Sequence, residues 1–427
     1  MFASIVKSLS RTFLAILMTI VQLLLGHAGL VAPKQPAAPR DLAPVVFVHG
    51  LAGWGEGVPI DKYLPQWGMN AGSMKDYLAG EGYECYAASL GPVSSAWDRA
   101  CELYAHITGT RVDYGAAHSA AHNHERCGED YGEPLVPGWG EPGRELHLIG
   151  HSFGGATARL FAQLCEEGSA AEREATPKAE LSPLFSGKLK GRVASITTLG
   201  APHNGSSSME PGIDGTRTLI LLLNAMGIAG GVVPFVGDAY PYHLTHFHLT
   251  FRDFLRTPWN MLRDYSNFND GKDNAEWDLS IDGAAAVNKG LSCLPGVYYF
   301  SYAAQVTEDD GRGSQVPGDD IWFLFHTPAT AMGQKRAPFT TAGGTLVDET
   351  WAPNDGLVNV VSARAPAGEP YQTYNPKKLE AGVWQVMPLI IGWDHYDFVG
   401  GMKQVDGTPG IREFYLGLMR LLEQVPQ

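Results

Sequence analysis

The chain has 427 residues, of which 44% are hydrophobic, and it contains ten tryptophans. This is ample material for a globular core, in one large α/β domain or two smaller ones. The formal net charge of −14 argues against a nucleic acid as partner. The five cysteines are scattered and form no CxxC pair, so they indicate neither a disulfide scaffold nor a cysteine-based zinc site.

Residues 1–28 have the pattern of a secretory signal. Lys7 and Arg11 precede an apolar run at 13–25, and the small residues Gly26 and Ala28 suit a signal peptidase. The run is short for a membrane span. We therefore predict a secreted protein, with anchoring by an uncleaved N-terminal segment as the alternative. The Pro/Ala-rich residues 29–43 predict a linker, and residues 44–427 predict one large domain.

Strands and helices are predicted to alternate along most of this domain. Residues 45–48 are an uninterrupted β-branched and aromatic run, as expected for a strand buried on both faces of a sheet. Such alternation implies βαβ units and a mostly parallel central sheet flanked by helices. The further predicted strands are at 83–88, 146–149, 193–199 and 297–302, and the predicted helices are near 74–78, from 97, at 156–164 and at 411–422.

A G-x-S-x-G pentapeptide, Gly150 to Gly154, lies between a predicted strand and a predicted helix. In that context the motif is typical of a nucleophile elbow, which exposes the hydroxyl of Ser152 at the top of a sheet. The N–H of Phe153 lies near the helix N-terminus and can face a developing oxyanion. We assign the second oxyanion donor to the N–H of Leu51, in the glycine-rich loop after residues 45–48. A coincidental Gly/Ser-rich turn is the alternative.

Three of the 14 histidines fall within seven residues, at His118, His122 and His124. On a helix His118 and His122 would share one face. Histidines with a carboxylate suit Zn²⁺. A polar surface loop explains the same spacing equally well.

Residues 219–226 and 232–236 are strongly apolar, rich in glycine and outside the strand–helix alternation. We interpret them as part of a mobile lid at about 209–270 that covers the site in water. A buried helix is the alternative.

Asp355 lies in a turn before Gly356, and His395 lies near the C-terminus. With Ser152 they follow the order Ser…Asp…His that is found in α/β-hydrolases. A serine hydroxyl is a poor nucleophile until an imidazole takes its proton, and a carboxylate must orient that imidazole. Asp394 is a poor candidate for this carboxylate, because adjacent side chains seldom meet in that geometry.

With Asp98, the histidines and Trp277-Asp278 included, the chain resembles the zinc-containing thermoalkalophilic bacterial triacylglycerol lipases, family I.5. The likeness runs from about 44 to 422 and rests on His49-Gly50 with Gly53-Trp54-Gly55, and on residues 95–101, 112–118, 182–185 and 354–356. It implies an α/β-hydrolase fold with a zinc-binding insertion at about 92–130 and a helical lid. It also implies a hydrolase of long-chain acyl esters, above all triacylglycerols, that acts at a lipid–water interface.

The resemblance makes Ser152 the nucleophile, His395 the general base and then acid, and Asp355 the orienting carboxylate. It makes Asp98, His118, His124 and Asp278 the ligands of a structural zinc, and it passes over His122. Three features depart from the family. Gly150 replaces the usual alanine, and the oxyanion donors are Leu51 and Phe153 in place of Phe and Gln. For calcium, Asp397 fits the family's carboxylate two residues after the histidine, but the family's following Asp-Pro is absent, which puts a Ca²⁺ site in doubt.

Two other functions remain open from the sequence. An acyltransferase or a phospholipase would use the same three residues. A non-catalytic hydrolase-fold binding protein would keep the fold without the reaction, although all three positions are intact here.

Overall fold

Seven strands form one parallel central sheet in a computed structural model that describes residues 37–141, 143–213, 240–250, 253, 258–401 and 410–426. The register places β1 between β2 and β5, and every pairing in this sheet is parallel. In spatial order the strands are β13 (Tyr371–Thr373), β14 (Trp384–Val386), β7 (Tyr298–Tyr302), β6 (Val193–Leu199), β5 (Leu146–His151), β1 (Val45–Val48) and β2 (Cys85–Ala88).

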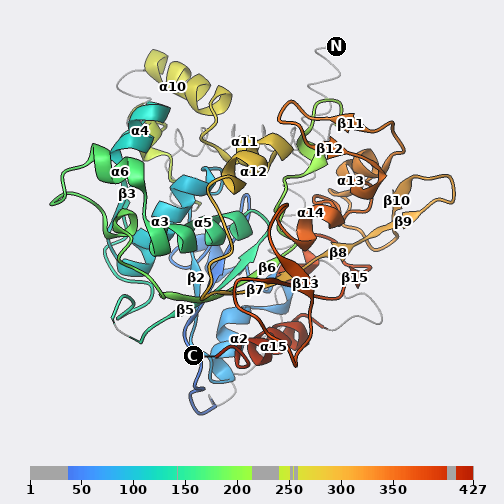
Figure 1. Cartoon of the computed structure of the whole chain (residues 1–427), viewed down its shortest axis with the longest axis horizontal. Coiled ribbons are helices and arrows are strands. Elements are labelled where there is room, and N and C mark those ends of the chain that lie inside the picture. The colour runs from blue at the N-terminus through green and yellow to red at the C-terminus, as the bar shows by residue number, and fades with distance from the viewer. Residues whose placement is uncertain are drawn as a thin grey trace.

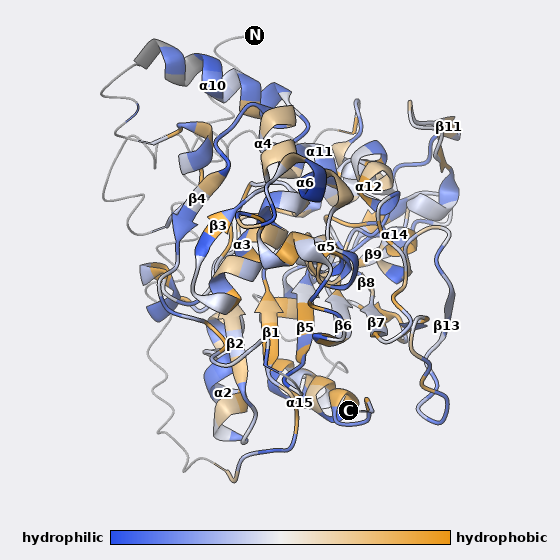
Figure 2. Ribbon diagram, turned by 60° about the vertical axis from the view of Figure 1, so that its left-hand side comes forward, coloured by the Kyte–Doolittle hydropathy of each residue, from blue (hydrophilic) through white to orange (hydrophobic). Residues whose placement is uncertain are grey.

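Helices cover both faces of this sheet (Figure 1). Alternate residues of β1 point to opposite faces, as the pleat of a strand requires. Val46 and Val48 pack in the cluster that contains residues of α3 (Ala96–Thr108) and α5 (Gly154–Glu167). Val45 and Phe47 pack in the cluster that contains α2 (Met74–Gly80) and α15 (Ile411–Leu422). The central strand β1 is therefore hydrophobic throughout, as its orange colour shows in Figure 2.

A small antiparallel unit interrupts the alternation after α3. It consists of β3 (Arg111–Asp113), α4 (Ala116–His122) and β4 (Cys127–Asp130). It falls inside the insertion that was predicted at 92–130, and it carries two of the predicted metal ligands, His118 and His124.

The other elements lie outside the central sheet, and all of them but α10 are short. The helices are α6 (Ala170–Ala175), α10 (Pro258–Asp270), α11 (Ala275–Leu279), α12 (Ile281–Asn288), α13 (His326–Gly333) and α14 (Val360–Arg364). The small paired strands are β8 (Ala304–Gln305) with β15 (Ile390–Ile391), β9 (Thr307–Asp309) with β10 (Gln315–Pro317), and β11 (Phe339–Thr340) with β12 (Leu346–Val347). The 3₁₀ turns are η1 (Pro59–Lys62), η2 (Met69–Ala71), η3 (Pro183–Ser186), η4 (Ser207–Met209), η5 (Thr245–Phe247), η6 (Glu349–Trp351) and η7 (Asp397–Val399).

The predicted mostly parallel sheet is confirmed, and all five predicted strands lie in it. The expected signal at 1–28 and the apolar lid stretches at 219–226 and 232–236 lie outside the described residues. In the part of the chain that is described, no helix is both long and apolar enough to cross a bilayer. All five cysteines are free.

Candidate active site and metal cluster

The pentapeptide Gly150–Gly154 forms a tight turn between β5 and α5. Ser152 has a φ of 54°, in the left-handed region of backbone conformations that residues other than glycine rarely adopt. A Cβ at Gly154 would lie 2.0 Å from the carbonyl oxygen of Val48, so only glycine fits there. A Cβ at Gly150 would lie 2.6 Å from the carbonyl oxygen of Gly154, which accounts for glycine at this position too. The local backbone thus holds Ser152 in the strained conformation of an elbow.

The structure brings Asp355 and His395 into direct contact. Oδ2 of Asp355 lies 2.8 Å from Nδ1 of His395, and both side chains are buried. Oδ1 of Asp355 accepts hydrogen bonds from the N–H groups of Leu357 (3.1 Å) and Val358 (2.8 Å). These bonds fix the carboxylate, and the carboxylate in turn favours the imidazole tautomer with its proton on Nδ1. That tautomer leaves Nε2 free to accept a proton.

The backbone of His395 is held as well. Its N–H donates to the carbonyl of Asp355 (2.8 Å), and its own carbonyl accepts from Nε2 of His151 (2.9 Å). Burial keeps the pKa of His151 well below its usual range, so this imidazole is neutral and donates through Nε2. His151, the second residue of the pentapeptide, therefore ties the elbow to the histidine loop. The motif gave no indication of this role.

Asp394 has other partners, as expected. Its Oδ2 accepts from the N–H of Trp322 (2.7 Å), and its Oδ1 accepts from the N–H of Tyr396 (2.8 Å). Burial raises the pKa of Asp394 to about 6. The carboxylate that contacts the imidazole of His395 is that of Asp355.

Leu51, Ser152 and His395 line one cavity of about 170 Å³. Most of the remaining lining residues are apolar, among them Met209, Leu279, Leu324, Phe325, Leu357 and Val358. Phe153, the other predicted oxyanion residue, is fully buried directly after Ser152. Among the described residues, neither the N–H of Leu51 nor that of Phe153 donates to a protein acceptor. Leu51 and Ser152 thus border a site that suits an acyl chain, and the N–H of Phe153 follows Ser152 directly in the chain.

A second group of residues converges outside this cavity. One ligand atom from each of Asp98, His118, His124 and Asp273 lies within 4.8 Å of the other three. Nε2 of His118 is 3.3 Å from Oδ1 of Asp98 and 3.2 Å from Oδ2 of Asp273, and Nε2 of His124 is 3.1 Å from the same Oδ2. Two imidazoles and two carboxylates are a donor set that suits tetrahedral Zn²⁺.

Buried atoms in this cluster support a cation. Oδ1 of Asp98 and Nε2 of His124 are buried, and although Nε2 of His118 and Oδ2 of Asp273 lie close to them, neither atom has a partner in hydrogen-bonding geometry among the described residues. Burial alone would lower the pKa of His118, but its contacts with Asp273 and Asp98 raise it to about 10. The negative potential that retains a proton on His118 would equally favour a bound cation. The residues therefore fit a metal.

Three residues that sequence reasoning missed support the ligands. The buried carboxylate of Glu172 accepts from the N–H groups of Ala117 (2.9 Å) and His118 (2.8 Å) at the start of α4. Nε2 of His246 lies 3.0 Å from Oδ2 of Asp98, and the carbonyl of Glu125 lies 2.8 Å from Nδ1 of His124. Such outer contacts orient metal ligands. No local motif marks Glu172 or His246, because only the tertiary fold brings them here.

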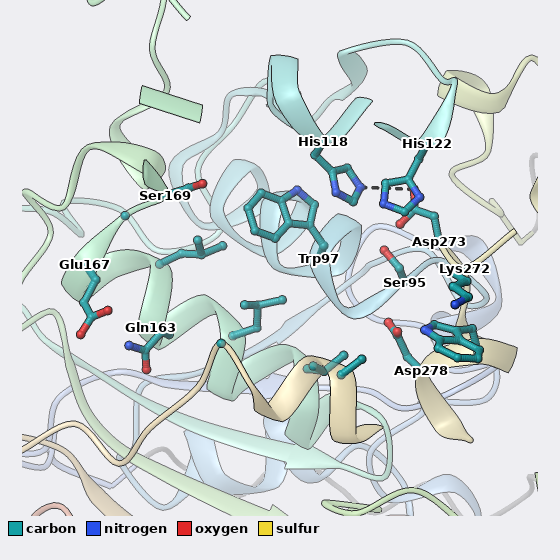
Figure 3. Close-up of a pocket in the computed structure, with 17 residues that line it drawn as sticks. Ser95, Trp97, His118, His122, Gln163, Glu167, Ser169, Lys272, Asp273 and Asp278 are labelled. Carbon is teal, nitrogen blue, oxygen red and sulfur yellow. Dashed lines mark hydrogen bonds and ion pairs between the residues drawn. The ribbon is translucent and has the colours of Figure 1, made fainter. Parts of the chain in front are cut away.

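The fourth member of the cluster differs from the prediction. The structure places Asp273 there and not Asp278. Asp278 lies in α11, where its Oδ2 accepts from the N–H of Ala96 (2.7 Å) at the start of α3. Figure 3 shows the two carboxylates around a cavity of about 370 Å³, with His118 joined to Asp273 and Asp278 apart from that pair. Asp278 caps a helix, and Asp273 precedes α11 and faces the histidines. His122 lines the same cavity outside the cluster.

Among the described residues, the predicted calcium residue, Asp397, belongs to no comparable set of metal-ligating side chains. Its Oδ2 accepts from the N–H of Asp394 (2.8 Å), and burial together with the neighbouring Asp394 raises its pKa to about 8. In the described part of the chain the two carboxylates are satisfied by backbone N–H groups, whereas Ca²⁺ takes 6–8 oxygens. The Ca²⁺ site at Asp397 therefore stays a prediction.

Comparison with known proteins agrees with the fold and with this geometry. A family model described as "Lipase-like, C-terminal domain" matches residues 41–426. Lipase 2 of Staphylococcus aureus (strain MSSA476) is 36% identical over 376 residues, which cover 85% of this chain and 51% of that protein. The chain thus spans about half the length of these curated relatives.

Solved structures of related proteins match this chain over nearly their whole length. Staphylococcus hyicus lipase has a TM-score of 0.77 at 30% identity, with 92% of this chain and 98% of that chain covered. Lipase 1 from Pelosinus fermentans has a TM-score of 0.73 at 32% identity, with 91% and 100% covered. The chain therefore belongs to the lipase-like C-terminal domain family, with the α/β-hydrolase fold of the bacterial lipases.

Proposed function

We propose that this chain is a serine ester hydrolase that cleaves long-chain acyl esters, above all triacylglycerols. The observation that carries this proposal is the 2.8 Å contact between Asp355 and His395, beside a mostly apolar cavity that is lined by both His395 and the elbow residue Ser152. The family membership and the lipase names of its relatives point to the same chemistry.

The reaction would proceed in two acyl-transfer steps. Nε2 of His395 takes the proton of the Ser152 hydroxyl as Oγ attacks the ester carbonyl, while Asp355 stabilises the resulting imidazolium. The N–H groups of Leu51 and Phe153 stabilise the tetrahedral oxyanion. His395 then protonates the leaving alcohol, which leaves an acyl group on Ser152. Water, deprotonated by the same imidazole, releases the fatty acid and restores the serine.

The cavity favours an acyl chain over a polar acyl group, because its walls are mostly apolar side chains. Profiling the purified enzyme with esters of increasing chain length would establish its preference. Hydrolysis in the presence of competing alcohols would distinguish a hydrolase from an acyltransferase, which would make new esters. The expected signal at residues 1–28 would direct the enzyme out of the cytoplasm.

For the cluster of Asp98, His118, His124 and Asp273 we propose one structural Zn²⁺. The four ligands would fill a tetrahedral site and leave no position for substrate. The ion would supply positive charge that offsets two buried carboxylates, and it would link α3, the α4 insertion and the segment before α11. The esterolytic steps do not need it.

Replacement of Ser152 by alanine tests the proposed reaction. We expect Ser152→Ala to lower ester hydrolysis by roughly 10⁴-fold or more with an unchanged melting temperature, since it deletes only the attacking oxygen. Ser208→Ala is the matched control, because Ser208 is a buried serine in the wall of the same cavity. Substantial activity in Ser152→Ala, in protein that melts normally, would overturn the assignment of the nucleophile.

A further inference from the structure

One arginine is completely buried between the two segments that carry the oxyanion donors. Arg99 lies in the second turn of α3, and its side chain is inaccessible to solvent. Burial lowers its pKa to about 10, so it stays charged at neutral pH. A buried charge is costly unless its donors are satisfied. The partners of its guanidinium group therefore show what it holds in place.

The guanidinium group contacts both oxyanion segments. Nη2 donates to the carbonyl of His49, two residues before Leu51. Nε donates to Oγ1 of Thr157 (3.0 Å), and that hydroxyl donates to the carbonyl of Phe153 (3.3 Å). The guanidinium carbon also lies 5.3 Å from the centre of the Phe153 ring, in cation–π range. One rigid planar group thus bridges the loop after β1 and the start of α5.

A third segment, residues 91 and 92, connects the loop after β1 to α3. Nη1 of Arg99 donates to the carbonyl of Gly91 (2.6 Å), and the N–H of Gly91 donates to Oε2 of Glu102 (2.6 Å). The next residue, Pro92, accepts from the N–H of Ala52 (2.9 Å). Residues 91 and 92 are therefore held by α3 and in turn hold the residue after Leu51.

We infer that Arg99 is a positioning residue that fixes the relative placement of the Leu51 and Phe153 N–H groups. This inference rests on the proposed function. Because its donors lie in one plane, the guanidinium group sets the positions of His49, Gly91 and Thr157 relative to one another, which an ammonium group cannot do. Oxyanion stabilisation depends on donor positions within a few tenths of an ångström, so loss of Arg99 should affect the transition state more than the bound substrate.

The chain provides a matched control in Arg159 on α5. Arg159 is also buried, and burial likewise lowers its pKa to about 10. Its Nη1 donates to Oδ1 of Asn288 (2.8 Å), and its guanidinium carbon lies 6.0 Å from the ring centre of Trp384. These contacts are away from the oxyanion segments. If substitutions of Arg99 and Arg159 lower the melting temperature equally but only the Arg99 substitution lowers kcat, Arg99 acts by positioning and not only by stabilising the fold.

The experiment compares Arg99→Met, Arg99→Lys and Arg159→Met in the full chain, with a soluble p-nitrophenyl ester and with butaneboronic acid. The boronic acid forms a tetrahedral adduct with a serine and so reports on the oxyanion site. We expect Arg99→Met to lower kcat about 100-fold, to change KM less than threefold and to raise the boronate Ki in proportion to the loss of kcat/KM. Arg99→Lys should fold and recover only part of kcat, whereas Arg159→Met should keep kcat and the boronate Ki.

Two results would overturn the inference. One is a wild-type kcat in folded Arg99→Met or Arg99→Lys. The other is an equal loss of kcat in Arg159→Met, which would indicate general destabilisation. If Arg99→Met fails to fold, the kcat and boronate Ki of Arg99→Lys decide. Failure of the proposed function is distinct, because Ser152→Ala would then remain active whatever the Arg99 variants do.

Discussion

The elbow and the metal cluster place their reactive side chains in different ways. Ser152 owes its position to a contiguous pentapeptide, in which two glycines and one positive φ fix the turn. Asp98 and Asp273, in contrast, meet from α3 and from the segment before α11, with two histidines of the α4 insertion between them. The elbow is therefore determined by local backbone geometry, and the cluster by long-range packing. Its two carboxylates, which repel each other, lie close together because the fold brings their segments together around the two histidines.

The largest loss of activity among the variants that test this comparison is expected for a substitution of Asp355. Asp355→Asn should lower kcat by about 10⁴-fold, because the amide favours the wrong imidazole tautomer while still accepting from the N–H of Val358. Steady-state kinetics with a soluble ester measure the change. Asp394→Asn is the control, since Asp394 is the adjacent acidic residue and contacts backbone N–H groups. A larger loss in Asp394→Asn than in Asp355→Asn would exchange their roles.

The next effect concerns stability and not chemistry. Asp273→Asn should abolish zinc binding and lower the melting temperature by several degrees, since a ligand at a thousandfold excess over Kd stabilises by about 4 kcal/mol. Metal analysis and calorimetry measure both quantities. Asp278→Asn should retain one zinc per chain, because an amide oxygen can still accept from the N–H of Ala96. Retention of zinc by Asp273→Asn together with its loss in Asp278→Asn would show that the fourth ligand is Asp278, as the resemblance implied.

A smaller contrast is expected among the histidines. His124→Ala removes a ligand and should lose zinc, while His122→Ala should keep it, because His122 lies outside the cluster. In both variants esterolysis near room temperature should stay within a few-fold of wild type. Loss of zinc in His122→Ala alone would mean that the helical pair His118 and His122 holds the metal.

The comparison also explains which parts of the fold and of the site could be predicted from the sequence alone. The buried strand 45–48 was predicted to the residue because it is apolar without interruption, and strand 193–199 because it is a run of β-branched and small residues that is buried along its whole length. The elbow was predictable because close backbone contacts leave no room for a side chain at its two glycines. The choice between Asp273 and Asp278 was not predictable, since one lies just before α11 and the other within it, and only the packing of α3 and the histidines distinguishes them. The same holds for Arg99 and Glu172, whose partners lie far away in sequence.

The central claim, that Ser152 is the nucleophile of a triad with His395 and Asp355, is tested most directly by covalent labelling. A long-chain p-nitrophenyl phosphonate would be incubated with the purified enzyme, and the labelled peptide would be sequenced by tandem mass spectrometry. We predict one phosphonyl group per chain on Ser152, release of one nitrophenol, complete inactivation, and no labelling of Ser152→Ala. Labelling of another residue with loss of activity, or full activity after labelling of Ser152, would contradict the claim.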